Sequence, residues 1–101
     1  MGSDTRIEQD SLGEVAVPAD ALYGAQTQRA VDNFTFGGGP MPAGFIASLG
    51  LIKAAAARAN ARLGELDDAV AGAIYQAAMA IARGEYREQF PVDVYQTGSG
   101  T

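Results

Sequence analysis

The segment from Ala69 to Ala82 restricts the possible folds more than any other part of the chain. It contains no charged residue, and Gln76 is its only strongly polar one. Its apolar residues recur at helical spacing on two different sides. One side carries Val70, Ile74, Ala77 and Ile81, and the other carries Ala71, Tyr75, Met79 and Ala82. A helix that is apolar around most of its circumference is normally buried on several sides. This helix is therefore expected to need more than one packing partner.

A second helix is predicted directly before it, from about Ala43 to Leu63. Its apolar residues form one narrow stripe made of Phe45, Leu49, Ile52, Ala56, Ala59 and Leu63. Gly64 follows, where a left-handed residue ends many helices. Asp67 or Asp68 can cap the next helix, which is expected to run to about Arg83 and to stop at Gly84. The alanines at 54–57 favour helix and allow a neighbouring helix to approach closely.

The N-terminal part predicts a β-hairpin followed by a short helix. The strands are Arg6–Asp10 and Glu14–Val17, joined through Gly13 and ended by Pro18. Their apolar positions are Ile7, Val15 and Val17. A helix is expected over 24–34, and the polar side chains of Gln26, Gln28 and Arg29 could line a polar site or simply face water. Three glycines and two prolines within 36–42 predict a loop. The fold class is therefore mainly α with a small β-hairpin at the start.

Composition excludes several classes of function. The net charge is −5 and only seven basic residues are scattered along 101 positions, which argues against nucleic-acid binding. No apolar run is long enough for a membrane span. The chain has no Cys and no His, so it lacks thiolate nucleophiles, Cys-type zinc sites and the usual general base near neutral pH. We expect no metal or cofactor, and the chain does not have the composition of a complete catalyst.

The stretch from Gln89 to Thr101 has the composition of a ligand-binding loop. An apolar extended run with one Asp leads into glycines and hydroxyl residues. Glycines permit close approach to a ligand, and successive backbone N–H groups with neighbouring hydroxyls can hold one anion. The suited ligand is a carboxylate or a phosphate. The candidate binding loop is the five-residue stretch Thr97–Thr101, and the alternative is a frayed terminus.

Three ordered blocks give the chain a specific family resemblance. They are 6–20 (RIEQDSLGEVAVPAD), 23–34 (YGAQTQRAVDNF) and 89–101 (QFPVDVYQTGSGT). Together they resemble the N-terminal segment of class II fumarases, in the fumarase/aspartase superfamily, from about Arg6 to Thr101. The resemblance implies a metal-independent carbon–oxygen lyase of the tricarboxylic acid cycle, cytoplasmic, that interconverts fumarate and L-malate. It also implies a mostly helical, three-domain homotetramer whose active site is shared among subunits.

The same resemblance implies which residues bind substrate. Thr97, Ser99, Gly100 and Thr101 match the family's substrate-binding motif and would hold a substrate carboxylate. The serine, histidine, lysine and asparagine that complete the family's site lie further along the chain than Thr101. No catalytic residue is therefore assigned within this chain, and we expect it to be inactive alone. Residues 1–5 are expected to be a tag remnant or a disordered start, and 6–101 an incomplete N-terminal domain.

Two alternatives stay open. An aspartate ammonia-lyase fragment is one, although Gln28 and the run Thr97-Gly98-Ser99 resemble fumarase more than aspartase. A non-enzymatic helical interaction module with a disordered tail is the other. One companion helix and a hairpin cannot cover both apolar sides of the helix over 69–82. The chain is therefore expected either to self-associate strongly or to be a piece of a larger protein.

Overall fold

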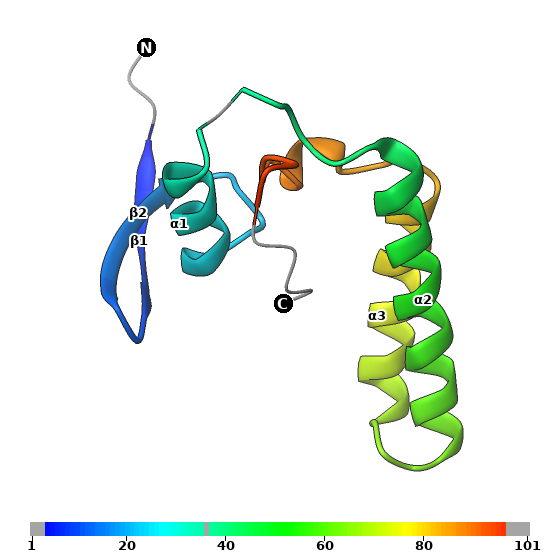
Figure 1. Ribbon diagram of the computed structural model, residues 1–101. Coiled ribbons are helices and arrows are strands. Elements are labelled where there is room, and N and C mark those ends of the chain that lie inside the picture. Colours follow the sequence, from blue (N-terminus) through cyan, green and yellow to red (C-terminus); the bar gives the residue numbers. More distant parts are fainter. Residues whose placement is uncertain (1–3, 36, 97–101) are drawn as a thin grey trace. The chain divides into compact units, whose positions relative to one another are not determined.

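The computed structural model describes residues 4–35 and 37–96. Its elements, in order, are β1 (Thr5–Asp10), β2 (Gly13–Pro18), α1 (Ala25–Asn33), α2 (Ala43–Arg62), α3 (Asp68–Ala82) and the short 3-10 helix η1 (Arg87–Gln89). The chain divides into two compact units (Figure 1). We call Pro42–Arg87 the helix unit, and Met1–Met41 with Glu88–Thr101 the hairpin unit. The mainly helical fold with an N-terminal hairpin is as the sequence predicts.

In the helix unit, α2 and α3 lie side by side and pack through small residues (Figure 1). The buried positions on the facing sides are Gly50, Ala54 and Ala57 of α2 and Ala71 and Ala78 of α3. The two backbones approach so closely at Gly50 that a Cβ placed there would lie 2.8 Å from the carbonyl oxygen of Ala78. We call this small-residue contact the α2–α3 seam. At this seam the two helix backbones pack closely, and the larger apolar side chains of α2 are left uncovered.

The predicted apolar stripe of α2 does not face α3. Phe45, Leu49, Ile52 and Leu63 are all exposed, Leu63 by 73%. On α3 the side that carries Ala71, Tyr75, Met79 and Ala82 faces inward, whereas Val70 and Ile74 remain 48% and 39% exposed. The stripe by itself did not predict which face of α2 packs against α3, and it stays exposed because large apolar residues cannot fit where two helix backbones meet at van der Waals distance. The expectation that one companion helix leaves one side of α3 uncovered is confirmed.

Both long helices end in the same hydrogen-bonded motif. After α2, Gly64 has φ +75° and the N–H of Glu65 donates to the carbonyl of Asn60 at 2.9 Å. After α3, Gly84 has φ +94° and the N–H of Glu85 donates to Ala80 at 3.1 Å. These are Schellman motifs, which require the left-handed residue that glycine adopts without strain. The predicted helix ends at both glycines are confirmed.

The start of α3 is fixed by Asp67. Its carboxylate Oδ2 accepts hydrogen bonds from the N–H groups of Ala69 and Val70, at 3.1 and 3.3 Å. Asp67 is therefore the N-cap, and Asp68 is the first residue of the helix. Of the two candidates for the cap, the first is the one used.

Substitutions at two glycines distinguish the effect of close helix packing on stability from the effect of helix propensity. We predict that Gly50→Ala destabilises the chain by about 1–3 kcal/mol, because the methyl group would meet the backbone of α3. Gly72→Ala is the matched control, since nothing lies within 4 Å of a Cβ built there. It should stabilise α3 by about 0.5–1 kcal/mol through helix propensity. Urea unfolding followed by circular dichroism measures both, and equal effects of the two variants would contradict the close seam.

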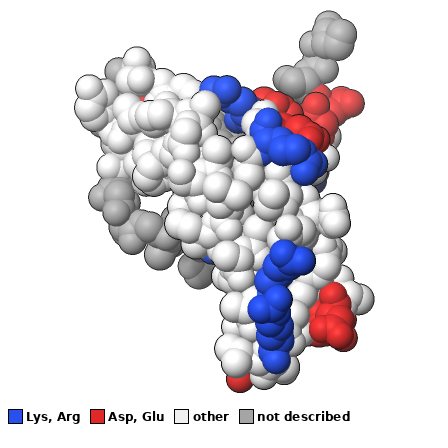
Figure 2. Space-filling model, turned by 90° about the vertical axis from the view of Figure 1, so that its right-hand side faces the viewer, with Lys and Arg blue, Asp and Glu red and all other residues white. Residues whose placement is uncertain are grey.

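The outer surface of the helix unit is largely apolar. Figure 2 views the molecule from the side of α2 and α3, where most of the visible surface is uncharged and basic side chains form a narrow stripe. The exposed apolar residues of this unit include Phe45, Leu49, Leu51, Ile52, Leu63, Val70 and Ile74. Exposed apolar side chains in such number promote association in water.

We predict that the isolated chain self-associates in a concentration-dependent way through this surface. Ile52→Lys should weaken the association, because it places a charge on a residue that is 62% exposed. Leu12→Lys adds the same charge at a 78% exposed position in the hairpin turn and should leave association unchanged. Sedimentation velocity over a concentration series measures both. A monomer at every concentration would contradict the prediction.

In the hairpin unit, β1 and β2 pair antiparallel from Thr5 opposite Pro18 to Asp10 opposite Gly13. Strand alternation places Arg6, Glu8 and Asp10 of β1 on the same face as Val15 and Val17 of β2. Val17 is fully buried. Ile7, one of the three apolar positions on which the hairpin prediction depends, pairs with Ala16 on the other face and is 60% exposed.

Two arginines hold the hairpin unit together. The guanidinium of Arg6 donates to four backbone carbonyls in the segment after β2, those of Pro18, Ala19, Ala21 and Tyr23, at 2.7–3.1 Å. Arg29 of α1 donates through Nε to Asp10 Oδ2 at 2.9 Å and through Nη2 to the Gly13 carbonyl at 3.0 Å. Five N–H donors in a fixed arrangement make arginine suited to donating to several acceptors at once. The polar inner face of β1 therefore anchors both the following segment and α1.

The Arg29–Asp10 pair predicts a loss of stability in acid. The hydrogen bond from Arg29, with help from the N–H of Leu12, holds the pKa of Asp10 below its ordinary value. A carboxylate with a lowered pKa stabilises the fold above its unfolded pKa, about 3.9, and this contribution disappears as the pH falls through the lower folded value. Asp10→Asn should thus lower the melting temperature near neutral pH, and the deficit should shrink below about pH 4. Asp4→Asn is the control, and a pH-independent deficit for Asp10→Asn would contradict the prediction.

Candidate functional site

The predicted binding residues Thr97, Ser99, Gly100 and Thr101 lie outside the described residues. Their role therefore stays a prediction. The structure does describe the segment that leads to them, Phe90–Gln96, and the elements against which this segment lies. All of these contacts fall within the hairpin unit.

Asp93 is the centre of this segment. Its side chain is the one buried charged group among residues 4–35 and 37–96, with 7% exposure. Oδ1 accepts a hydrogen bond from the N–H of Tyr95 at 2.8 Å. Oδ2 accepts from the N–H groups of Gly38 and Gly39 at 3.0 and 3.2 Å. The carboxylate is thus stabilised by three backbone donors, as anions are in loops whose N–H groups converge.

The glycine loop at 37–39 forms the surface against which this segment packs. The N–H of Val94 donates to the carbonyl of Gly39 at 2.9 Å, and Pro40 forms an isolated antiparallel bridge with Asp93. A Cβ at Gly38 would lie 2.6 Å from the ring of Tyr95 and 2.9 Å from Val94. Any side chain at position 38 would therefore force the Tyr95 or Val94 side chain to shift. Of the loop predicted for 36–42, the described residues 37–42 form no helix or strand, but their function as a contact partner was not foreseen.

A further contact fixes the start of the segment. The N–H of Leu22 donates to the Gln89 Oε1 at 2.6 Å, which joins the end of η1 to the chain between β2 and α1. This hydrogen bond at the start of the segment, and those of Asp93 further along it, connect the segment to residues more than 50 positions away in sequence.

The polar residues of α1 are used mainly within the hairpin unit. Arg29 is engaged by Asp10 and Gly13, and Gln28 Nε2 donates to Asp32 Oδ1 at 2.9 Å. The Gln28 Oε1 is buried without a hydrogen-bond partner. The contacts of Arg29 therefore support a role in holding the hairpin unit together rather than in lining a polar site.

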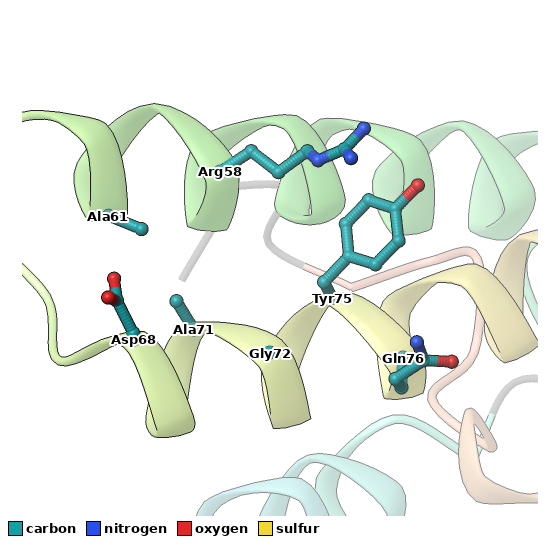
Figure 3. Close-up of a pocket in the computed structure, with 7 residues that line it drawn as sticks. All are labelled: Arg58, Ala61, Asp68, Ala71, Gly72, Tyr75 and Gln76. Carbon is teal, nitrogen blue, oxygen red and sulfur yellow. The ribbon is translucent and has the colours of Figure 1, made fainter.

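The helix unit has a pocket of about 320 Å³ between α2 and α3 (Figure 3). Its lining residues are Arg58, Ala61, Asp68, Ala71, Gly72, Tyr75 and Gln76. The Arg58 guanidinium carbon lies 4.7 Å from the centroid of the Tyr75 ring, a cation–π contact. Asp68 and Gln76 lie at opposite ends (Figure 3). No group of acid, base and nucleophile is assembled here, and Tyr75 acts as a packing residue.

Two searches of the described residues bear on other classes of site. Residues 4–35 and 37–96 contain no cluster of three or more His, Cys, Asp or Glu side chains arranged to bind a metal ion. Within the same ranges, no helix has the length and apolar character that a membrane span requires.

Comparison with known proteins identifies the family. Residues 13–101 match the family model described as Lyase. The chain belongs to this lyase family. It is 59% identical over 96 residues to the class II fumarate hydratase of Xylella fastidiosa. The matched region covers 95% of this chain and 20% of that protein. It is 56% identical over 101 residues to the class II fumarate hydratase of Halobacterium salinarum, covering all of this chain and 22% of the relative.

A solved structure supports the same assignment. The class II fumarase of Schistosoma mansoni matches with a TM-score of 0.91 and 38% identity, over 97% of this chain and 21% of that one. The lyase chain thus spans about a fifth of the length of the relatives it matches. The resemblance to the N-terminal segment of class II fumarases, given by the three sequence blocks, is confirmed.

Proposed function

We propose that this chain is the N-terminal part of a fumarate hydratase, which reversibly hydrates fumarate to L-malate, and that its final residues bind a carboxylate of the substrate. The observation that carries the proposal is the identity of 56–59% with class II fumarate hydratases over 95% or more of the chain. The binding residues are Thr97, Ser99, Gly100 and Thr101, whose hydroxyl and backbone N–H groups suit a carboxylate.

The loop would position the substrate rather than transfer a proton. Hydration adds water across the double bond, so the reverse reaction removes a proton from carbon and releases water. Hydroxyl and N–H donors can orient the dicarboxylate and stabilise charge as it develops. Because these 101 residues include no His and no Cys, the proton-abstracting group is proposed to come from other residues of the complete enzyme. The complete enzyme is proposed to be a homotetramer.

Aspartate ammonia-lyase is the second candidate. It would bind a similar dicarboxylate through the same kind of loop, but would release ammonia instead of water. The identity with class II fumarate hydratases supports hydration over ammonia release. A non-enzymatic interaction module is the third, and the experiment below separates all three.

The test is a chimera in which this chain replaces the matching segment of the Halobacterium salinarum enzyme. We expect the chain alone to be inactive and the chimera to form fumarate from L-malate, measured by the ultraviolet absorbance of fumarate. L-Aspartate is the parallel substrate. Fumarate formation from L-aspartate alone would support the ammonia-lyase instead, and an inactive chimera would support the interaction module.

Within the active chimera, Ser99→Ala tests the binding loop. Loss of a hydrogen bond to a charged group costs about 1.5–3 kcal/mol, so the KM for L-malate should rise roughly 10- to 100-fold. Ser11→Ala is the matched control, because it removes an exposed hydroxyl in the turn of the hairpin. An unchanged KM in Ser99→Ala would exclude this hydroxyl from substrate binding.

A further inference from the structure

We propose that Asp93 is a positioning residue that fixes the backbone from which the substrate loop departs. This inference rests on the proposed function of Thr97–Thr101 and extends it to residues that do not touch the substrate. Asp93 lies four positions before Thr97. Its hydrogen bond to the N–H of Tyr95 holds the last turn of the chain before that loop.

The carboxylate joins two segments that are 55 residues apart. One oxygen is used within its own segment, and the other binds Gly38 and Gly39. Binding loops must hold their groups within about 0.5 Å of the productive geometry, and such accuracy comes from supporting hydrogen bonds. A carboxylate that accepts one N–H bond from its own segment and two from the glycine loop supplies this support just before Thr97.

Asparagine has the same shape as aspartate but cannot make these contacts. Three N–H donors converge on the two oxygens of Asp93, and an amide offers only one acceptor oxygen. If that oxygen faces Tyr95, the amide NH₂ faces the N–H groups of Gly38 and Gly39. If the amide is reversed, NH₂ faces the N–H of Tyr95. Either orientation brings donor against donor, so Asp93→Asn releases one anchor with little change in volume.

Gly38 provides an independent way to disturb the same contact. Because a Cβ there would lie 2.6 Å from the Tyr95 ring, Gly38→Ala must push the ring or the segment away. This variant leaves the Asp93 side chain intact and buries no unpaired polar group. It therefore keeps the proposal testable if Asp93→Asn fails to fold.

The experiment uses the chimera described above, with L-malate as substrate. Asp93→Asn and Gly38→Ala should each raise the KM about 10- to 100-fold, as misplacement of a binding group does, while kcat changes less than about threefold. Asp67→Asn is the matched control for the first, because Asp67 also accepts two backbone N–H bonds but at the start of α3. Gly44→Ala is the control for the second, since a Cβ there meets nothing within 4 Å. Both controls should leave the KM unchanged.

Hydrogen–deuterium exchange of the peptide that contains residues 94–101 gives a second readout. L-Malate should slow its exchange in the unsubstituted chimera and not in Asp93→Asn. If Asp93→Asn and Gly38→Ala lower the melting temperature but leave the KM and the malate effect intact, Asp93 is only a structural tie and the inference is overturned. If the unsubstituted chimera shows neither activity nor slower exchange with L-malate, the proposed function is wrong. The positioning role, which rests on that function, is then wrong as well.

Discussion

The close approach of α2 and α3 at Gly50 determines how the helix unit is built. Because a Cβ at residue 50 would lie 2.8 Å from the Ala78 carbonyl oxygen, only glycine fits at this point of the seam. Alanines at 54, 57, 71 and 78 continue the close contact. Close contact between the two helices supplies dispersion energy. The larger apolar side chains of α2 lie outside this contact, where Ile52 is 62% exposed.

This geometry explains which parts of the fold follow from sequence. The helices, their ends at Gly64 and Gly84, and the hairpin depend on local signals, namely periodicity, left-handed glycines and turn residues, and they were predicted. The packed face of α2 was not, because hydrophobic periodicity follows the largest side chains. In a seam of glycine and alanine, the large side chains mark the face turned away from the partner. The buried face of the hairpin was not predicted either, since β1 turns charged residues inward to bond backbone carbonyls and Arg29.

In the candidate site, too, some features can be predicted from local sequence, whereas others depend on contacts between residues that are distant in the sequence. The glycine and hydroxyl composition of the final residues can be recognised in the sequence, and so can the family. The contact of Asp93 with Gly38 and Gly39 cannot, because it joins positions 54 and 55 residues apart. One signal was available: a single Asp within an apolar extended run must find partners or remain exposed. The glycine run then had two possible roles, linker or close contact, and only the structure distinguishes them.

The hydrogen-bonded carboxylates of the hairpin unit hold its backbone together. Asp93 is buried and accepts three backbone N–H bonds, and Asp10 is engaged by Arg29 and the N–H of Leu12. For Asp10, the hydrogen bond from Arg29 also holds the pKa below its ordinary value. Removing either carboxylate would leave its donors without their acceptor, so both side chains fix backbone geometry. The anion-binding role proposed for Thr97–Thr101 therefore depends on hydroxyl and N–H donors, with Asp93 acting only through the backbone that it holds.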